Sequence, residues 1–231
     1  MSVKDIVQIR HSVRAFKADP VSRTDIEDLI ERACRSPSGG NLQPWEITVV
    51  TGEARDAAAQ AGLKAIMANP AGEDGDYPVY PPGLNDPWRT RRTESGEAMY
   101  EALGISRDDK MARLQWLTRN FDFFGAPVGI FLSIDKAMGH SQWAHMGMFA
   151  QTFALLAVEK GLGVCMQEAW AKVRVTMHTH LGLDADKVLW CGIALGYADE
   201  AAPVNRFRTD RAPLDEIVTF RDKALTGQVT S

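Results

Sequence analysis

The chain has 231 residues, of which 45% are hydrophobic and 24% charged, and its formal net charge is −4. A hydrophobic fraction near the globular average of roughly 45–50% excludes intrinsic disorder, and the length suits one large domain or two small ones. The net negative charge argues against a general binder of nucleic acids or membrane surfaces, because such proteins rely on positive fields.

The three cysteines lie far apart in the sequence, at Cys34, Cys165 and Cys191. They form no C-x-x-C pair, which excludes a disulfide framework and a thiolate zinc site. Residues 1–10 lack the apolar run of a secretory signal, and the most apolar stretch, residues 146–158, is shorter than the roughly 20 residues that a membrane span needs. We therefore expect a soluble, cytoplasmic protein without a bound metal.

In chain order, the first predicted helix covers residues 20–35. Ser22 is a candidate N-cap, and apolar residues follow it at the i, i+3, i+4 and i+7 spacing of one helix face. Residues 36–41, which include Pro37 and two glycines, predict a turn that ends this helix. The β-branched run at residues 45–51 predicts a buried strand.

An alanine-rich helix is predicted at residues 53–69. The composition then changes, because residues 70–88 hold five of the eleven prolines and three glycines and show no periodicity. This segment is either a surface insertion or a lid, since long irregular loops in compact domains commonly cover binding sites. Two further helices are predicted at residues 94–103 and 108–120.

The second half of the chain alternates strands with helices. Strands are predicted at residues 128–134, 163–167 and 188–195, with a helix at residues 173–181. A long helix is predicted from Ser141, a candidate N-cap, to about Lys160. Nearly all faces of this helix are apolar, which is typical of a helix in the centre of a core or at a subunit interface.

Arginines supply the most informative pattern near the N-terminus. Arg10, Ser12 and Arg14 alternate, so in an extended segment they point to one side. Two guanidinium groups and a hydroxyl there suit a phosphate, because arginine forks match its oxygens. The alternative is a solvated basic strand, and spacing alone leaves both interpretations open. Neither G-x-G-x-x-G nor G-x-x-x-x-G-K-[ST] occurs, so Rossmann and Walker sites lose their main support.

Other polar residues give weaker signals. A second arginine group lies at residues 206–211 and a third at residues 89–92, and we interpret the third as solvated surface. The histidines lack metal-ligand spacing, and no G-x-S-x-G elbow supports a serine hydrolase. The residues alone thus predict a soluble α/β or α+β domain with a candidate phosphate-containing ligand.

Four separated motifs resemble those of the FMN-dependent nitroreductases. They are RHSVRAF followed by SPSGGNLQPWEITVV, then RNFDFFGAPVGIFL, EKGLGVCMQEAW and NRFRTDRAPLDEIVTF, in the order of that family. The insertion at residues 70–107 is less typical and is similar to a subgroup with a helical excursion there. The resemblance implies a single domain over residues 1–231, with this insertion as a candidate substrate lid.

The resemblance also implies a fold and an activity. The fold is α+β, with three α-β-α layers around a mixed central sheet, and the chains form an intertwined homodimer with two flavins at the interface. FMN is the bound cofactor and NAD(P)H the hydride donor, and the acceptor is a nitroaromatic or quinone-like compound in a ping-pong reaction. The flavin carries the chemistry, so no side chain is expected as an indispensable acid or base.

Carried over residue by residue, the motifs assign two groups. The cofactor group is Arg10, His11, Ser12, Arg14, Pro37, Ser38, Gly39, Asn41, Met166, Gln167, Glu168, Arg208 and Arg211. Within it, Arg14 and Arg211 are expected at the phosphate, and the backbone of residues 166–168 near flavin N5. Gly40 and Asn120 are expected on the substrate side.

Other functions stay open on the same fold. The alternatives are reductive dehalogenation, flavin fragmentation and a flavin-binding module without turnover. The insertion would decide between the enzymatic alternatives, because it would cap the substrate. Its aromatic side chains either stack on an aromatic substrate or simply pack the insertion; they are Tyr77, Tyr80, Trp88 and Tyr100.

Overall fold

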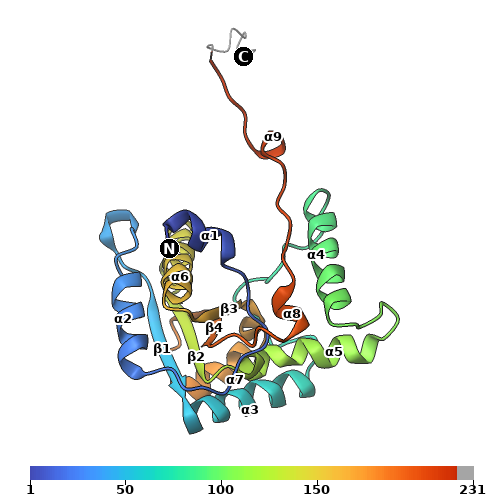
Figure 1. Cartoon of the computed structure of the whole chain (residues 1–231). Coiled ribbons are helices and arrows are strands. Elements are labelled where there is room, and N and C mark those ends of the chain that lie inside the picture. The colour runs from blue at the N-terminus through green and yellow to red at the C-terminus, as the bar shows by residue number, and fades with distance from the viewer. Residues whose placement is uncertain (223–231) are drawn as a thin grey trace, which may run out of the picture.

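A four-stranded sheet forms the middle of the computed structural model, which describes residues 1–222 (Figure 1). Its strands are β1 (Glu46–Thr51), β2 (Val128–Asp135), β3 (Gly163–Gln167) and β4 (Lys187–Gly196), in the order β1-β2-β4-β3. All three strand pairs are antiparallel, so the expected mixed sheet is wrong for these strands. Within residues 1–222, parallel pairing is limited to one isolated bridge between Ser12 and Val164.

The six helices predicted from the sequence occur in the expected order, and the described residues form three further short helices that were not predicted. In chain order, the helices are α1 (Val3–Ile9), α2 (Arg23–Ala33), α3 (Gly52–Ala68), α4 (Trp88–Ala102), α5 (Lys110–Thr118), α6 (His140–Glu159), α7 (Arg174–Leu181), α8 (Pro203–Arg206) and α9 (Leu214–Ile217). Short 3₁₀ segments lie at η1 (Gly39–Asn41), η2 (Arg119–Gly125) and η3 (Glu168–Val173).

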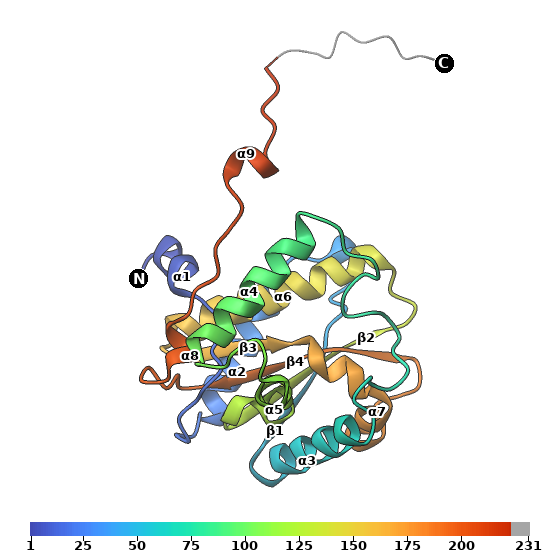
Figure 2. The ribbon, with the colours of Figure 1, turned by 90° about the vertical axis from the view of Figure 1, so that its right-hand side faces the viewer.

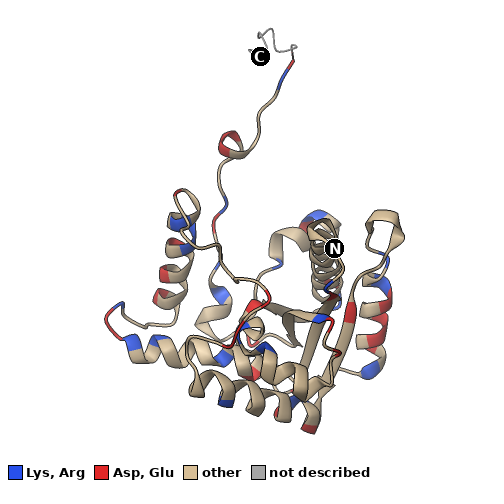
Figure 3. Ribbon diagram, turned by 180° about the vertical axis from the view of Figure 1, so that it is seen from behind, with Lys and Arg blue, Asp and Glu red and all other residues tan. Residues whose placement is uncertain are grey.

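Helices cover both faces of the sheet, which gives the expected α+β fold with three layers (Figure 2). Successive side chains of β2 point to opposite faces, so Ile130 and Leu132 pack with α2 and α6, whereas Phe131 packs with α3, α7 and η3. Charged residues lie mainly on the surrounding helices and loops (Figure 3). The two apolar clusters therefore sandwich the sheet.

Helix α2 matches its prediction closely. The amide of Asp25 donates to Ser22 Oγ, which confirms Ser22 as the N-cap, and Ile26, Leu29 and Ala33 are buried. Strand β1 differs from its prediction, because Val50 is its only buried residue. As the end strand of the sheet, β1 pairs only with β2, so most of its side chains reach solvent.

Helix α6 begins two residues earlier than predicted. Gly139 is the N-cap and Ser141 lies inside the first turn, so the prediction of Ser141 as the cap is wrong. One side of α6 packs into the core through residues such as Phe149 and Phe153, which are 1% exposed. Met148 on another side is 44% exposed, so the helix is not enclosed on all sides within one chain.

The insertion is anchored to the body of the domain. Helix α4 starts at Trp88, earlier than the predicted residue 94, because Asp86 accepts from Thr90 Oγ1 and pairs with Arg89 at the start of the helix. Ahead of it, Glu73 accepts from the amide of Thr176 at 3.0 Å and the Tyr77 hydroxyl donates to the carbonyl of Trp190. The irregular segment is thus tied to η3, α7 and β4.

Two ion pairs extend these ties. Asp76 pairs with Arg174 of α7 at 3.2 Å, and Glu97 of α4 receives two bonds of 2.7 Å from Arg113 of α5. Within residues 1–222, no helix is both long and apolar enough to cross a membrane.

Candidate functional site

The segment after α1 runs along the edge of β3. Arg10 caps α1, and the amide of Val13 donates to the carbonyl of Val164 at 2.9 Å. Val13 is 2% exposed and packs on Gly163, where a Cβ atom would lie 2.7 Å from Val13 Cγ2. The buried valine fixes the segment, so that Arg10 and Arg14 flank it at the end of the sheet.

The C-terminal arginines come to the same place. Asn205, which is 5% exposed, accepts from the amide of Arg14 and donates to the carbonyl of Ala15 at 2.7 Å. Arg208 and Arg211 follow directly in the chain. Burial, and next the charge of Arg211, lower the pKa of Arg10, so these two side chains are close enough to repel each other. We call Arg10, Arg14, Arg208 and Arg211 the arginine cluster.

No carboxylate neutralises the arginine cluster within residues 1–222. None of its members takes part in an ion pair with Asp or Glu there. Arg208 Nη1 donates to the carbonyl of Asn205 at 2.7 Å, and Arg211 Nη1 to Thr209 Oγ1 at 2.7 Å. Four unpaired cations in one place are unfavourable without an anion, which indicates an anion-binding site.

His11 completes this site. Its Nδ1 lies 3.0 Å from the carbonyl of Ile9, and its Nε2 is buried without a hydrogen-bond partner. Burial is the main cause that lowers the pKa of His11, and the charges of the cluster add to it. The neutral ring therefore donates from Nδ1 and offers Nε2 as an acceptor. A ligand with a phosphate and hydroxyl groups satisfies both the cluster and this nitrogen.

The end of β3 supplies the next part of the site. Met166 is 37% exposed, whereas Gln167 is 1% exposed and holds two segments together. Its Nε2 donates to the carbonyl of Asn120 at 2.7 Å, and its Oε1 accepts from Trp170 Nε1 at 3.3 Å. The side chain of Glu168 makes no hydrogen bond or ion pair in the described part of the chain, and partial burial raises its pKa. The backbone of residues 166–168 thus has a fixed position beside Asn120.

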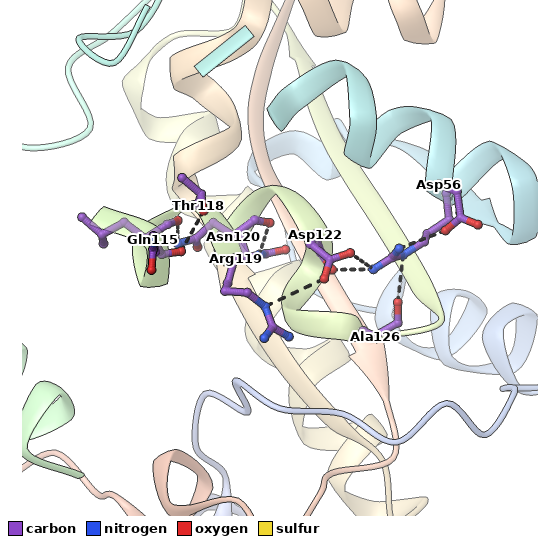
Figure 4. A network of polar contacts seen from close by, with 10 residues as sticks. Asp56, Gln115, Thr118, Arg119, Asn120, Asp122 and Ala126 are labelled. Atoms are coloured by element: carbon purple, nitrogen blue, oxygen red, sulfur yellow. Dashed lines mark hydrogen bonds and ion pairs between the residues drawn. The ribbon is translucent and has the colours of Figure 1, made fainter. Parts of the chain in front are cut away.

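A network on η2 holds Asn120 in place (Figure 4). Phe123 and Phe124 have φ values of 48° and 54°, a left-handed conformation that costs energy for residues other than glycine. Arg55 of α3 offsets this cost, because it donates to Asp122 Oδ1 at 2.7 Å and to the carbonyl of Ala126 at 3.1 Å. No sequence pattern indicated Arg55, which lies in a regular helix and is 67 residues from Asp122 in the chain.

The predicted turn at residues 36–41 attaches to α6. Ser36 Oγ donates to Thr152 Oγ1 at 2.9 Å, and the amide of Gly39 donates to His145 Nε2 at 3.3 Å. Gly40 has a φ of 61°, which only glycine adopts freely. Among the described residues, no hydrogen bond links this turn to the arginine cluster. Within one chain, the arginine cluster, the end of β3 and Asn120 therefore belong to one region. The turn is attached to α6 instead, and it contains the predicted residues Pro37, Ser38, Gly39, Gly40 and Asn41.

Comparison with known proteins agrees with this architecture. The sequence profile described as the Nitroreductase family matches residues 7–197. The nitrobenzene nitroreductase of Ectopseudomonas oleovorans is 34% identical over 94% of this chain and 96% of its own length. The 4-nitrobenzoate reductase of Pseudomonas putida is 37% identical over 89% of both chains.

Solved structures are similar over nearly the whole chain. The FMN- and NADPH-dependent nitroreductase NfnB from Sphigopyxis sp. strain HMH has a TM-score of 0.93 and 47% identity, over 96% of this chain and 99% of its own. The FMN-dependent NfnB from Mycobacterium smegmatis in complex with NADPH has a TM-score of 0.89 and 32% identity, over 94% and 97%.

The fold and site define an α+β domain with an anion site at one end of its sheet. The extent of the family match identifies it further: the chain belongs to the nitroreductase family.

Proposed function

We propose that the protein is an FMN-dependent oxidoreductase that takes hydride from NAD(P)H and reduces nitroaromatic compounds. The observation that carries the proposal is the arginine cluster, which gathers four cations without a carboxylate among residues 1–222. The relatives named above support it, because they are a nitrobenzene nitroreductase, a 4-nitrobenzoate reductase and FMN-dependent enzymes. Quinone-like compounds are a second class of acceptor that the same site would take.

The residues present fit FMN. Arg14 and Arg211 would hold its phosphate, with Arg10 and Arg208 adding positive charge. The unpartnered Nε2 of His11 accepts a hydrogen bond, which suits a ribityl hydroxyl. When bound, FMN supplies the transfer of hydride between NAD(P)H and the acceptor. The protein binds and orients the reactants and keeps water out of the site.

The predicted residues at the end of β3 and on η2 would form two walls of this site. The backbone amides of residues 166–168 would face the flavin edge, with Ser12 alongside them and Asn120 on the substrate side. Arg55 and Gln167 act as positioning residues, because their hydrogen bonds fix the backbone around Asn120. The insertion at residues 70–107 would cover the substrate, with Tyr77 anchored to β4 and close enough to Glu168 for that carboxyl to help raise its pKa.

Turnover tests the proposal directly. The purified protein, loaded with FMN, is mixed with NADPH and 4-nitrobenzoate, and NADPH consumption is followed at several fixed acceptor concentrations. We expect acceptor-dependent oxidation with the parallel double-reciprocal lines of a ping-pong reaction. If NADPH reduces the flavin but no nitroaromatic or quinone reoxidises it, the acceptor class is wrong. If NAD(P)H does not reduce it, a flavin-binding module replaces the enzyme.

We also propose that the active form is an intertwined homodimer in the cytoplasm. The segment after α8 extends away from the body of the domain (Figure 1) and carries exposed apolar side chains, with Ile217 at 64% and Phe220 at 80%. Met148 leaves one side of α6 partly uncovered, next to the 36–41 turn. A second copy that covers both surfaces would bring its 36–41 turn to the arginine cluster.

Light scattering coupled to size exclusion tests the dimer. We expect twice the chain mass of 25.5 kDa at micromolar concentration, and a shift toward the monomer in a variant that ends at Arg211. A full-length protein that elutes as a monomer would contradict the dimer without affecting FMN binding by the cluster itself.

A further inference from the structure

A concave surface lies in the insertion, and none of its lining residues belongs to the arginine cluster. Residues 80–85 and the first turns of α4 line an open cavity of about 550 Å³, whose lining includes Tyr80, Pro81, Leu84, Trp88 and Arg92. Two aromatic rings are unusually open here, because Tyr80 is 51% and Trp88 61% exposed. Exposed aromatic rings grouped at a cavity are typical of a binding site.

Arg92 is the polar group of this cavity. The neighbouring arginines are occupied, since Arg89 pairs with Asp86 at 2.8 Å and Arg91 with Glu216 at 2.6 Å. The side chain of Arg92 makes no hydrogen bond or ion pair within residues 1–222. Its guanidinium lies over the ring of Tyr80, with Cζ 4.0 Å from the ring centroid. This stacking fixes the plane of the guanidinium and leaves its edge N–H groups for an anion.

The combination selects a class of ligand. Aromatic side chains stack on a nucleobase whatever its identity, and a guanidinium beside them binds a phosphate. A purine nucleoside with a phosphate on its ribose satisfies both features, whereas a simple phosphate leaves the rings uncovered and an unsubstituted aromatic compound leaves Arg92 unpaired.

The position of the cavity fits the far end of a long ligand. Glu216, the partner of Arg91, follows Arg211 by five residues, so at most about 18 Å of chain separates it from the arginine cluster. The α4 turn that carries Arg91 and Arg92 therefore lies on the same side of the molecule as the cluster. A dinucleotide can span from a flavin to this cavity, but a single-ring acceptor that reacts at the flavin cannot also occupy it.

We propose that the cavity binds the adenosine 2′-phosphate end of NADPH, a subsite that rests on the proposed function. The adenine ring stacks on Trp88 and Tyr80, and the 2′-phosphate accepts hydrogen bonds from Arg92. NADH lacks that phosphate and gains only the stacking. Arg92 is therefore a specificity-determining residue that favours NADPH over NADH.

Binding of two nucleotide probes tests the subsite without any turnover. Isothermal titration of the FMN-loaded protein with adenosine 2′,5′-bisphosphate and with 5′-AMP compares ligands that differ in the 2′-phosphate. We expect the bisphosphate to bind about tenfold or more tightly, as for a hydrogen bond to a charged group, and Arg92→Gln to abolish this difference. Trp88→Ala should weaken both probes by similar factors, because stacking does not depend on the 2′-phosphate.

Arg89→Gln is the matched control, because Arg89 carries the same charge on the same helix but pairs with Asp86 outside the cavity. It should leave both affinities unchanged. In steady-state assays, Arg92→Gln should raise KM for NADPH about tenfold and leave KM for NADH and both kcat values within about twofold.

Three results would overturn the subsite: no preference of the wild-type protein for the bisphosphate, unchanged selectivity in Arg92→Gln, or an equal loss in Arg89→Gln. These outcomes are distinct from failure of the proposed function. If the proposed function fails, neither NADH nor NADPH reduces the flavin. The probe titrations still decide whether the cavity binds a 2′-phosphate.

Discussion

Arginine carries most of the positive charge of this chain, with 17 arginines against 9 lysines. Four of them form a cluster without carboxylate partners among the described residues, and their mutual repulsion is offset only when an anion binds. A guanidinium suits this role better than an ammonium, because its planar fork binds two phosphate oxygens at once. A net acidic protein thus holds a strongly cationic site in one small region.

Removing either phosphate-binding arginine should weaken the cofactor complex. We expect Arg14→Ala and Arg211→Ala each to lower FMN affinity by about 1.5–3 kcal/mol, the range of a hydrogen bond to a charged group. Quenching of FMN fluorescence on titration with the protein measures the change. Arg206→Ala is the control, since Arg206 lies outside the cluster and donates to the carbonyl of Ala201. Unchanged FMN affinity in both cluster variants would refute the phosphate assignment.

His11 should make the FMN-free protein sensitive to mild acid. Its pKa in the folded state lies below the ordinary 6.5, first because of burial and then because of the nearby arginines. The unfolded chain therefore binds more protons than the folded one, and stability is lost as pH falls below about 6.5 and through the folded pKa.

Urea unfolding of the FMN-free protein at pH 7.5 and pH 5.5 measures this effect. The free energy of unfolding should be lower at pH 5.5, and His11→Gln should reduce the difference. His178, whose pKa burial also lowers, should account for part of the remainder. The role assigned to His11 fails if the variant keeps the full pH dependence of the wild-type protein.

Local sequence patterns predicted some site residues and could not predict others. The alternation of Arg10, Ser12 and Arg14 suggested a phosphate site, and the structure brings Arg211 to the same region. Arg55 and His145 were missed, because their partners Asp122 and Gly39 lie in distant segments. A residue that acts only through tertiary hydrogen bonds leaves no periodic or motif signal.

At the scale of elements, glycines let aromatic rings pack directly on the sheet. A Cβ atom on Gly129 of β2 would lie 2.3 Å from Phe123 Cζ, and one on Gly192 of β4 would lie 2.3 Å from Trp170 Cδ1. These rings belong to η2 and η3, the segments that carry Asn120 and Glu168. The close contact of sheet and 3₁₀ segments therefore determines how the site is positioned.

Gly129→Ala should consequently destabilise the domain. The added methyl group overlaps the Phe123 ring, and overpacking of this kind typically costs about 1–3 kcal/mol. Gly96→Ala is the matched control, because Gly96 lies within α4 and a Cβ atom there meets nothing within 4 Å. That change should stabilise the protein by up to about 1 kcal/mol, as expected for Ala in a helix. Equal unfolding midpoints for the two variants would contradict this packing argument.

Helices were easier to predict than strand environments. The spacing of apolar residues located α2 to within a few residues, because one buried face repeats along the helix, and the alanine-rich composition located α3 equally well. For β1, the apolar run predicted a buried strand, but most of its residues are not buried. A β-branched run does not reveal whether a strand has one neighbour or two. The start of α4 was missed because the prolines before Trp88 obscured the Asp86 contacts that begin the helix.

For the whole molecule, the order of the main elements followed from the sequence patterns and the three layers from the family resemblance, but the strand directions did not. The connections between strands contain helices, and such connections are long enough to permit either parallel or antiparallel pairing. The meeting of residues 10–14 with residues 205–211 depends on Asn205. Its buried side chain bonds to the backbone of Arg14 and Ala15, and its backbone carbonyl accepts from Arg208. Only the folded structure reveals such a contact.

The central claim is that this chain binds FMN through the arginine cluster and passes hydride from NAD(P)H to a nitroaromatic acceptor. The most direct test is the visible absorption spectrum of the purified protein under anaerobic conditions, before and after additions. We predict the bands of oxidised flavin, with FMN released on heating, bleaching by NADPH and recovery when 4-nitrobenzoate is added. A protein that stays colourless after incubation with FMN would contradict the account.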